Sequence, residues 1–150
     1  MALTLTDYLS ALFFSFWATV SFAVLFQAPK RTLPISGMIG ALGWLVFITI
    51  KSYYLGSFYA NLLGALALSV CCEISARIFK EPAIVFIAPG IIPLVPGLGV
   101  YQGMDKMLSN SDAGMRILIT AGTDSIAIAV GVMLTTSIFR FIKFRKVKKI

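Results

Sequence analysis

Charged residues are scarce in this chain, and histidine is missing from it. Only 13% of the 150 residues are charged and 59% are hydrophobic, whereas soluble domains carry roughly 25% charged residues. Without histidine the protein has no imidazole metal ligand and no histidine proton relay. The composition therefore argues against a soluble domain and predicts a membrane protein with no metal site and no cofactor.

The chain also has few groups suited to catalysis. Its two cysteines, Cys71 and Cys72, are adjacent, so they form neither a metal quartet nor a loop-closing disulfide. The lack of histidine removes Ser-His and Cys-His pairs, and Asp124 has no second aspartate deep in an apolar run to form an acid pair. We expect that the protein is not an enzyme.

Long apolar runs fill most of the sequence. A run of about 20 apolar residues spans a bilayer, and five such segments are present: 8–26, 34–50, 54–76, 83–101 and 117–139. They predict an all-α integral membrane protein with one transmembrane domain over 1–139 and a basic tail over 140–150. Because no basic residue precedes the first run, we expect it to stay in the mature protein instead of acting as a signal peptide.

Basic residues are distributed unevenly among the predicted loops. With the amino terminus outside and five crossings, ten fall on the cytoplasmic side: Lys30, Arg31, Arg77, Lys80, Arg140, Lys143, Arg145, Lys146, Lys148 and Lys149. Three fall outside: Lys51, Lys106 and Arg116. Because cytoplasmic loops are enriched in Lys and Arg, this split predicts a multi-pass membrane protein with an external amino terminus and a cytoplasmic carboxyl terminus.

The net charge of +7 comes mostly from the tail. A basic segment next to a membrane helix binds anionic lipid headgroups, so the charge indicates membrane lipid as a partner and requires no nucleic acid. The tail is then a topological anchor, with a specific lipid or protein site as the alternative.

The fourth apolar segment contains three prolines and three glycines between residues 88 and 99. Proline removes a backbone donor and glycine permits non-helical angles, so the segment is predicted to be a broken or re-entrant helix over 83–101. A kinked helix or an apolar loop is the alternative. Broken helices mark transporter sites, and the substrate-binding or gating candidates are Pro89, Gly90, Pro93, Pro96, Gly97, Gly99, Tyr101 and, from the third run, Asn61. A helix beginning after Gly99 would direct its positive end at a solute carboxylate.

Asp124 lies well inside the fifth apolar run, on a face that carries small residues. An intramembrane carboxylate costs a few kcal/mol unless it is protonated, paired or hydrated. Asp124 is therefore the candidate for proton coupling and for binding a solute ammonium group. The alternative is a structural acid that caps a neighbouring helix or pairs with a basic residue of a partner.

Glu73 and Arg77 follow Asn61 along the third run at helical spacing. The acid precedes the base by four residues near the cytoplasmic surface, which favours an interfacial ion pair. A cytoplasmic gate, with Arg77 contacting a substrate carboxylate, is the alternative.

Three stretches of this sequence resemble a known family. The block Glu73 to Ala83, EISARIFKEPA, runs into PGIIPLVPG and Tyr101, and the earlier segment FQAPKRTLP fits the same pattern. They are similar to the small-subunit half of the threonine/serine exporter family. The resemblance covers most of the chain, but only the region from about Glu73 to Tyr101 is specific.

The resemblance implies a secondary exporter, driven by the proton motive force, that moves small hydroxy amino acids or related small carboxylates. It further implies a large-subunit membrane partner that carries the other half of the transporter; a homo-oligomer is the other possible assembly. Five spans per half would make two successive halves an inverted repeat. A structural or accessory subunit, or a channel-like pore without its own coupled transport, is the rival function.

Reporter fusions test the predicted topology. We expect a reporter at the carboxyl terminus to be cytoplasmic and one inserted between Gln102 and Arg116 to be external, because of the ten-to-three distribution of Lys and Arg. Two cytoplasmic termini would require an even number of spans and would contradict the inverted-repeat argument.

Overall fold

The computed structural model describes residues 5–53, 56–109 and 111–147, and all regular structure in these ranges is helical. The helices are α1 (Leu5–Leu25), α2 (Leu33–Ser52), α3 (Ser57–Phe79), α4 (Ile84–Ile91), the short 3-10 helix η1 (Ile92–Leu94), α5 (Gly97–Ser109) and α6 (Ser111–Val147). The predicted start of the third span at Tyr54, the residues before Leu5, and Lys148 and Lys149 of the tail lie outside the described residues.

Four of these helices, α1, α2, α3 and α6, are long and apolar enough to cross a membrane. A fifth span is available if the segment from α4 through η1 is joined to α5, because the two parts together are long and apolar enough and meet at a 42° bend. This finding confirms the all-α prediction and the break in the fourth apolar segment, and it allows four or five spans.

The break itself is short and lies at Val95 and Pro96. Val95 has extended backbone angles, φ −61° and ψ 127°, because the residue before a proline is driven out of the helical region. The amide of Gly97 donates to the carbonyl of Val95 at 2.8 Å and the amide of Val95 donates to that of Ile91 at 3.2 Å. Pro89 stays inside α4 and Pro93 lies in the 3-10 helix η1, so this segment leaves helical structure only at Val95 and Pro96.

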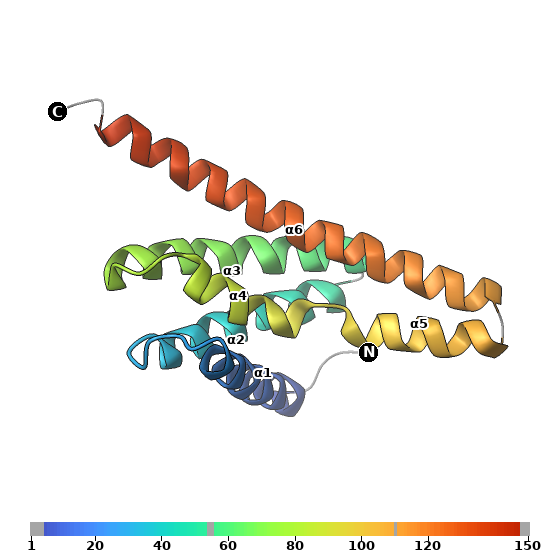
Figure 1. The fold of residues 1–150 in the computed structure, drawn as a ribbon. Helices are drawn as coiled ribbons and strands as arrows, with labels where there is room; N and C mark the ends of the chain where they lie inside the picture. Colours follow the sequence, from blue (N-terminus) through green and yellow to red (C-terminus); the bar gives the residue numbers. More distant parts are fainter. Residues whose placement is uncertain (1–4, 54–55, 110, 148–150) are drawn as a thin grey trace.

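Two helices extend further than the sequence indicated. The second arm of the broken segment continues past Tyr101 as α5 to Ser109, and α6 begins at Ser111. The stretch 102–116, expected as a loop, is therefore the tip of a helical hairpin, and Figure 1 shows this hairpin reaching beyond the ends of α1, α2 and α3. α6 also continues without interruption into the predicted tail as far as Val147.

α3 is the centre of the bundle. It packs against α2 on one side and α6 on the other, α1 packs on α2, and α4 contacts α1, α2 and α3 (Figure 1). The core gathers apolar residues from α2, α3, α4, η1 and α6, with Leu68 and Phe86 fully buried at its centre. Beyond α3, the extensive contacts of α6 are with α5 alone.

Small residues let these helices approach one another closely. A Cβ atom built at Gly64 would lie 3.1 Å from the backbone oxygen of Gly43, and one at Gly131 would lie 3.0 Å from the Cβ of Ala65. Gly64 and Gly131 are thus sites of close helix packing. Two other small residues of these helices are not: a Cβ built at Gly56 would meet no atom within 4 Å, and Thr123 is exposed.

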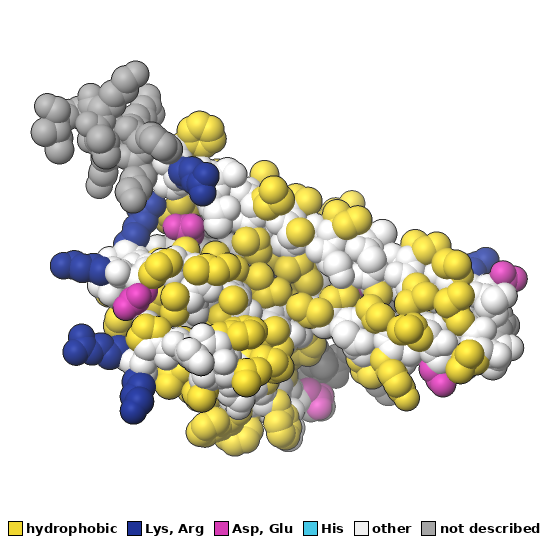
Figure 2. All heavy atoms as spheres, in the orientation of Figure 1, with side chains coloured by type: hydrophobic (Ala, Val, Ile, Leu, Met, Phe, Trp, Pro, Cys, Tyr) yellow, Lys and Arg dark blue, Asp and Glu magenta, His cyan; other side chains and the backbone are white. Residues whose placement is uncertain are grey.

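The outer surface suits a lipid environment. Apolar side chains cover most of the face shown in Figure 2, and Lys and Arg gather at the end where α3 terminates. Lys30, Arg31 and Lys80 come from the α1–α2 and α3–α4 connections, which Figure 1 places at that same end. The fold therefore brings together basic residues that the sequence assigned to one side of the membrane.

Replacing Gly40 with leucine tests the closest helix contact. A Cβ atom at Gly40 would overlap Oγ1 of Thr19 and lie 2.8 Å from its Cβ, so the substitution should separate α1 from α2 and destabilise the protein by about 1–3 kcal/mol, the usual cost of overpacking. Thermal unfolding in detergent measures this effect. Gly122→Leu is the control, because Gly122 has no neighbour within 4 Å; equal midpoints for the two variants would contradict the contact.

Candidate functional site

Asp124 lies on the buried face of α6, beside the first turn of α3. It is only 6% exposed, and its Oδ2 atom accepts a hydrogen bond of 2.6 Å from the hydroxyl of Ser57, the first residue of α3. The amino-terminal end of a helix carries a partial positive charge, so this position favours a carboxylate. Ser57 thereby holds one of the two carboxylate oxygens.

The second carboxylate oxygen of Asp124 has no partner in the described structure. Oδ1 of Asp124 and Oδ1 of Asn61 are both buried acceptors without a hydrogen bond. Asn61 is 2% exposed, and its amide donates to the backbone oxygen of Ser57 at 3.1 Å and, in a longer contact of 3.5 Å, to the Ser57 hydroxyl. Buried acceptors without partners are costly, so this pair marks a place for a proton or a ligand donor.

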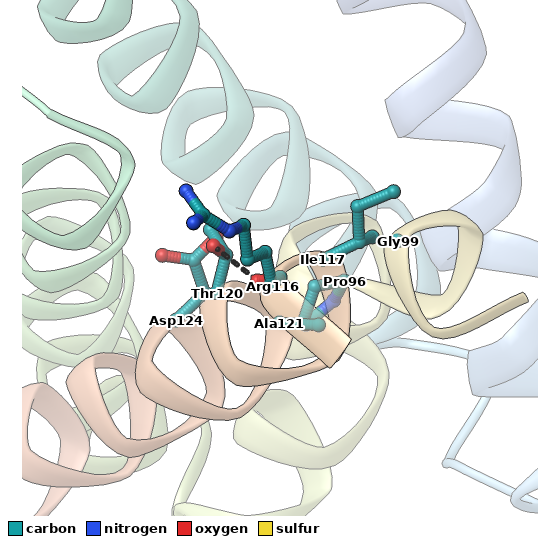
Figure 3. Close-up of a pocket in the computed structure, with 7 residues that line it drawn as sticks. All are labelled: Pro96, Gly99, Arg116, Ile117, Thr120, Ala121 and Asp124. Carbon is teal, nitrogen blue, oxygen red and sulfur yellow. Dashed lines mark hydrogen bonds between the residues drawn. The ribbon is translucent and has the colours of Figure 1, made fainter. Parts of the chain in front are cut away.

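A cavity opens beside Asp124 where the start of α5 meets α6. It has a volume of about 250 Å³ and is lined by Pro96, Gly99, Arg116, Ile117, Thr120, Ala121 and Asp124. Figure 3 shows the side chains of Arg116, Thr120 and Asp124 extending from the same side of α6. The hydroxyl of Thr120 donates to the backbone oxygen of Arg116 at 2.9 Å. The cavity thus has a cation and an anion in its wall.

Four of the residues predicted for the site come together here. Pro96 and Gly99 line the cavity with Asp124, and Asn61 is connected to Asp124 through Ser57. The break at Val95–Pro96 is what brings the beginning of α5 against α6. In the described residues no group of three Asp, Glu or Cys side chains is placed to hold a metal ion.

The other predicted residues of the broken segment lie elsewhere. Pro89 and Gly90 are buried in the core, and a Cβ at Gly90 would lie 3.3 Å from Leu68. Pro93 lines a separate groove against α1 and α2. Gly97 has no neighbour within 4 Å, and Tyr101 is 69% exposed. Bulky substitutions at Gly90 therefore probe packing, whereas Gly99 is the glycine whose replacement would fill the cavity.

Arg77 joins α3 to α6 near the basic end of the bundle. Its guanidinium donates to the backbone oxygen of Phe139 at 3.1 Å and lies 4.8 Å from the centre of the Phe139 ring. In the described part of the chain no ion pair joins it to Glu73, which is half-buried one turn earlier. The structure thus gives Arg77 an interhelical contact at this end of the bundle.

Two residues of the site carry no strong signal in the sequence. Ser57 begins α3 among polar and aromatic residues, and nothing in its spacing relates it to Asp124, 67 positions away. Arg116 was assigned to an outer loop, where its charge served only to set the topology. Arg116 lies about two turns before Asp124 on the same helix, which would have indicated a shared face. This signal was missed because the start of α6 at Ser111 was not predicted.

Comparison with known proteins gives a consistent result. A family model described as "Threonine/Serine exporter, ThrE" matches residues 11–138. A "Probable threonine/serine exporter" of Mycobacterium tuberculosis (strain ATCC 25618 / H37Rv) is 28% identical over 109 residues, which are 71% of this chain and 21% of that relative. A "Threonine/serine exporter" of Corynebacterium glutamicum is 30% identical over 115 residues, which are 76% of this chain and 23% of that relative.

The match is extensive for this chain and partial for its relatives. The matched region spans about a fifth of the length of these curated relatives. No solved structure matches the chain. The family model covers most of the chain, including α2 to α5 and the part of α6 that carries Asp124. The helices that could span a membrane and these matches make the protein a multi-pass membrane protein, and the chain belongs to the threonine/serine exporter family.

Proposed function

We propose that this chain is the small subunit of a secondary exporter that moves threonine, serine or related small carboxylates out of the bacterial cytoplasm and is driven by the proton motive force. Family membership supports the substrate class. The observation that carries the proposal is the Oδ1 atom of Asp124, which is buried without a hydrogen-bond partner at the edge of a cavity.

Asp124 has the arrangement that a coupling carboxylate needs. Ser57 fixes Oδ2 and thereby orients the side chain, while Oδ1 is left to bind either a proton or a positively charged group of the solute. A single oxygen cannot do both at once, so proton entry from outside would release the solute and loss of the proton inside would allow the next one to bind. Such mutual exclusion, in a site that opens alternately to the two sides of the membrane, would couple the solute to the proton.

The structure also offers an argument for a structural role of Asp124. One carboxylate oxygen is bonded at the first turn of α3, which is how an acid stabilises a helix end. In an accessory subunit or channel-like pore this bond would be the whole function of the residue. The coupling role and the structural role of Asp124 differ in the state of Oδ1, because a structural acid would have Oδ1 hydrogen-bonded to a donor.

The proposed assembly includes a large membrane subunit. The curated relatives are more than four times as long as the segment that matches this chain, so most of their length has no counterpart in it. The exposed apolar residues of α5 and α6 include Met104, Leu108 and Met133, which are free for contact with lipid or partner helices. We place the basic end of the bundle in the cytoplasm and the α5–α6 hairpin outside.

Asp124→Asn tests proton coupling. The amide keeps the shape of the side chain but cannot titrate, so uptake of serine into inverted vesicles under an imposed pH gradient should fall to the rate seen without a gradient. Membrane insertion should be unchanged because a neutral group is easier to bury. Asp112→Asn, an exposed acid in the first turn of the same helix, is the control. If serine uptake by the Asp124→Asn variant depends on the pH gradient as it does in the unmodified protein, Asp124 is not the coupling group and its role is structural.

Complementation tests the assembly. Expression of this chain alone should not restore efflux in an exporter-deficient cell, because helices with buried polar residues require partner helices to complete the site. Co-expression with a large-subunit partner should restore it. Transport by the purified chain in liposomes without a partner would favour a homo-oligomer.

A further inference from the structure

We propose that the cavity between Arg116 and Asp124 binds a small amino acid as its zwitterion, with Arg116 holding the carboxylate and the free Oδ1 atom of Asp124 accepting a hydrogen bond from the ammonium group. This inference rests on the proposed function, because it assumes that the protein binds a small solute. It adds the residue that recognises the solute's negative charge.

Two opposite charges line one cavity without neutralising each other. Arg116 and Asp124 are eight residues apart, about 12 Å along the helix axis at 1.5 Å per residue, and both lie in the cavity wall. Among the described residues no ion pair joins them. A cation and an anion that line one cavity without forming an ion pair match a ligand that carries both charges itself.

The acidic end of the cavity is suited to an ammonium group. Oδ1 of Asp124 and Oδ1 of Asn61 are buried acceptors without donors, and both residues contact Ser57. An ammonium group supplies three donors from one atom. One of these donors would satisfy Oδ1 of Asp124, whose side chain lines the cavity.

The basic end is suited to a carboxylate. A guanidinium group binds a carboxylate through two parallel hydrogen bonds. Gly99, in the first turn of α5, lines the same cavity, and the first amides of a helix lack intrahelical acceptors. The Arg116 side chain and the start of α5 both line the cavity, and both favour negative charge.

The walls between the two ends limit the size of the solute. Gly99, Ala121 and Thr120 line this part, and a Cβ at Gly99 would already contact the Cβ of Ala121 at 3.6 Å. The volume of about 250 Å³ is below the roughly 300–1,000 Å³ of sites for drug-sized ligands. The cavity thus has room for a solute of amino-acid size.

Competition binding separates the two ends of the proposed site. Labelled L-serine is bound to the detergent-solubilised protein, in whichever assembly restores efflux, and displaced by ethanolamine, which has no carboxylate, or by lactate, which has no ammonium. Arg116→Gln should weaken serine binding about tenfold or more, the loss of one charge-assisted hydrogen bond, and leave displacement by ethanolamine unchanged. Asp124→Asn should weaken serine and ethanolamine and spare lactate.

Three variants control this experiment. Lys106→Gln removes another cation of the α5–α6 hairpin that is not part of the cavity wall and should leave all three affinities unchanged. Arg116→Lys should recover part of the serine affinity, since it restores the charge without the paired hydrogen bonds. Gly99→Leu should abolish binding of all three probes by filling the cavity.

The outcomes distinguish this inference from the proposed function. An equal loss of serine and ethanolamine affinity in Arg116→Gln, or no loss of serine affinity, would overturn the role of Arg116. If the unmodified protein binds alanine with the expected pattern but neither serine nor threonine, the proposed substrates are wrong and the zwitterion site stands. If lactate binds as tightly as serine, the ammonium site is overturned. Small carboxylates then remain as the exported solutes.

Discussion

Hydrocarbon offers no hydrogen-bond partner to a peptide backbone, and this constraint governs the whole molecule. Inside a membrane every amide and carbonyl must be bonded within the protein, which the five long or paired helical segments achieve. The single interruption, at Val95 and Pro96, obeys the same rule: Pro96 has no amide, and the amides of Val95 and Gly97 find nearby carbonyls. The break therefore changes the direction of the chain at little cost in unsatisfied backbone groups.

That change of direction creates the site. Because the helix bends by 42°, α5 leaves the core and packs along α6, and its first turn forms one wall of the cavity. On the other side, the close approach of Gly131 to Ala65 holds α6 against α3 and brings Asp124 beside Ser57. The carboxylate is thus positioned by packing at small residues, while the polar atoms around it remain available for chemistry.

The free Oδ1 atom of Asp124 is the feature that distinguishes the proposed coupling role of this residue from a purely structural role. A purely structural acid in an apolar bundle would have both oxygens bonded, because each unmet acceptor costs free energy. Here one oxygen is fixed by Ser57 and the other lies buried beside a second unmet acceptor on Asn61. The proposed exchange of a proton for an ammonium group would use the oxygen that Ser57 leaves free, and the chain spans only about a fifth of the length of the curated relatives it matches.

Much of this protein follows from its sequence by itself. Apolar runs of membrane-spanning length set the helices, the prolines near residue 96 set the break, and the burial of a lone carboxylate singled out Asp124, because each effect acts within one segment of chain. Only the tertiary structure decided which residues meet. It placed Pro89 and Gly90 in the core, turned Tyr101 outward, bonded Ser57 to Asp124 and put Arg116 in the wall of the cavity beside Asp124. These relations depend on the angle at which helices distant in sequence cross and on how far α5 and α6 extend, and neither is encoded in local periodicity.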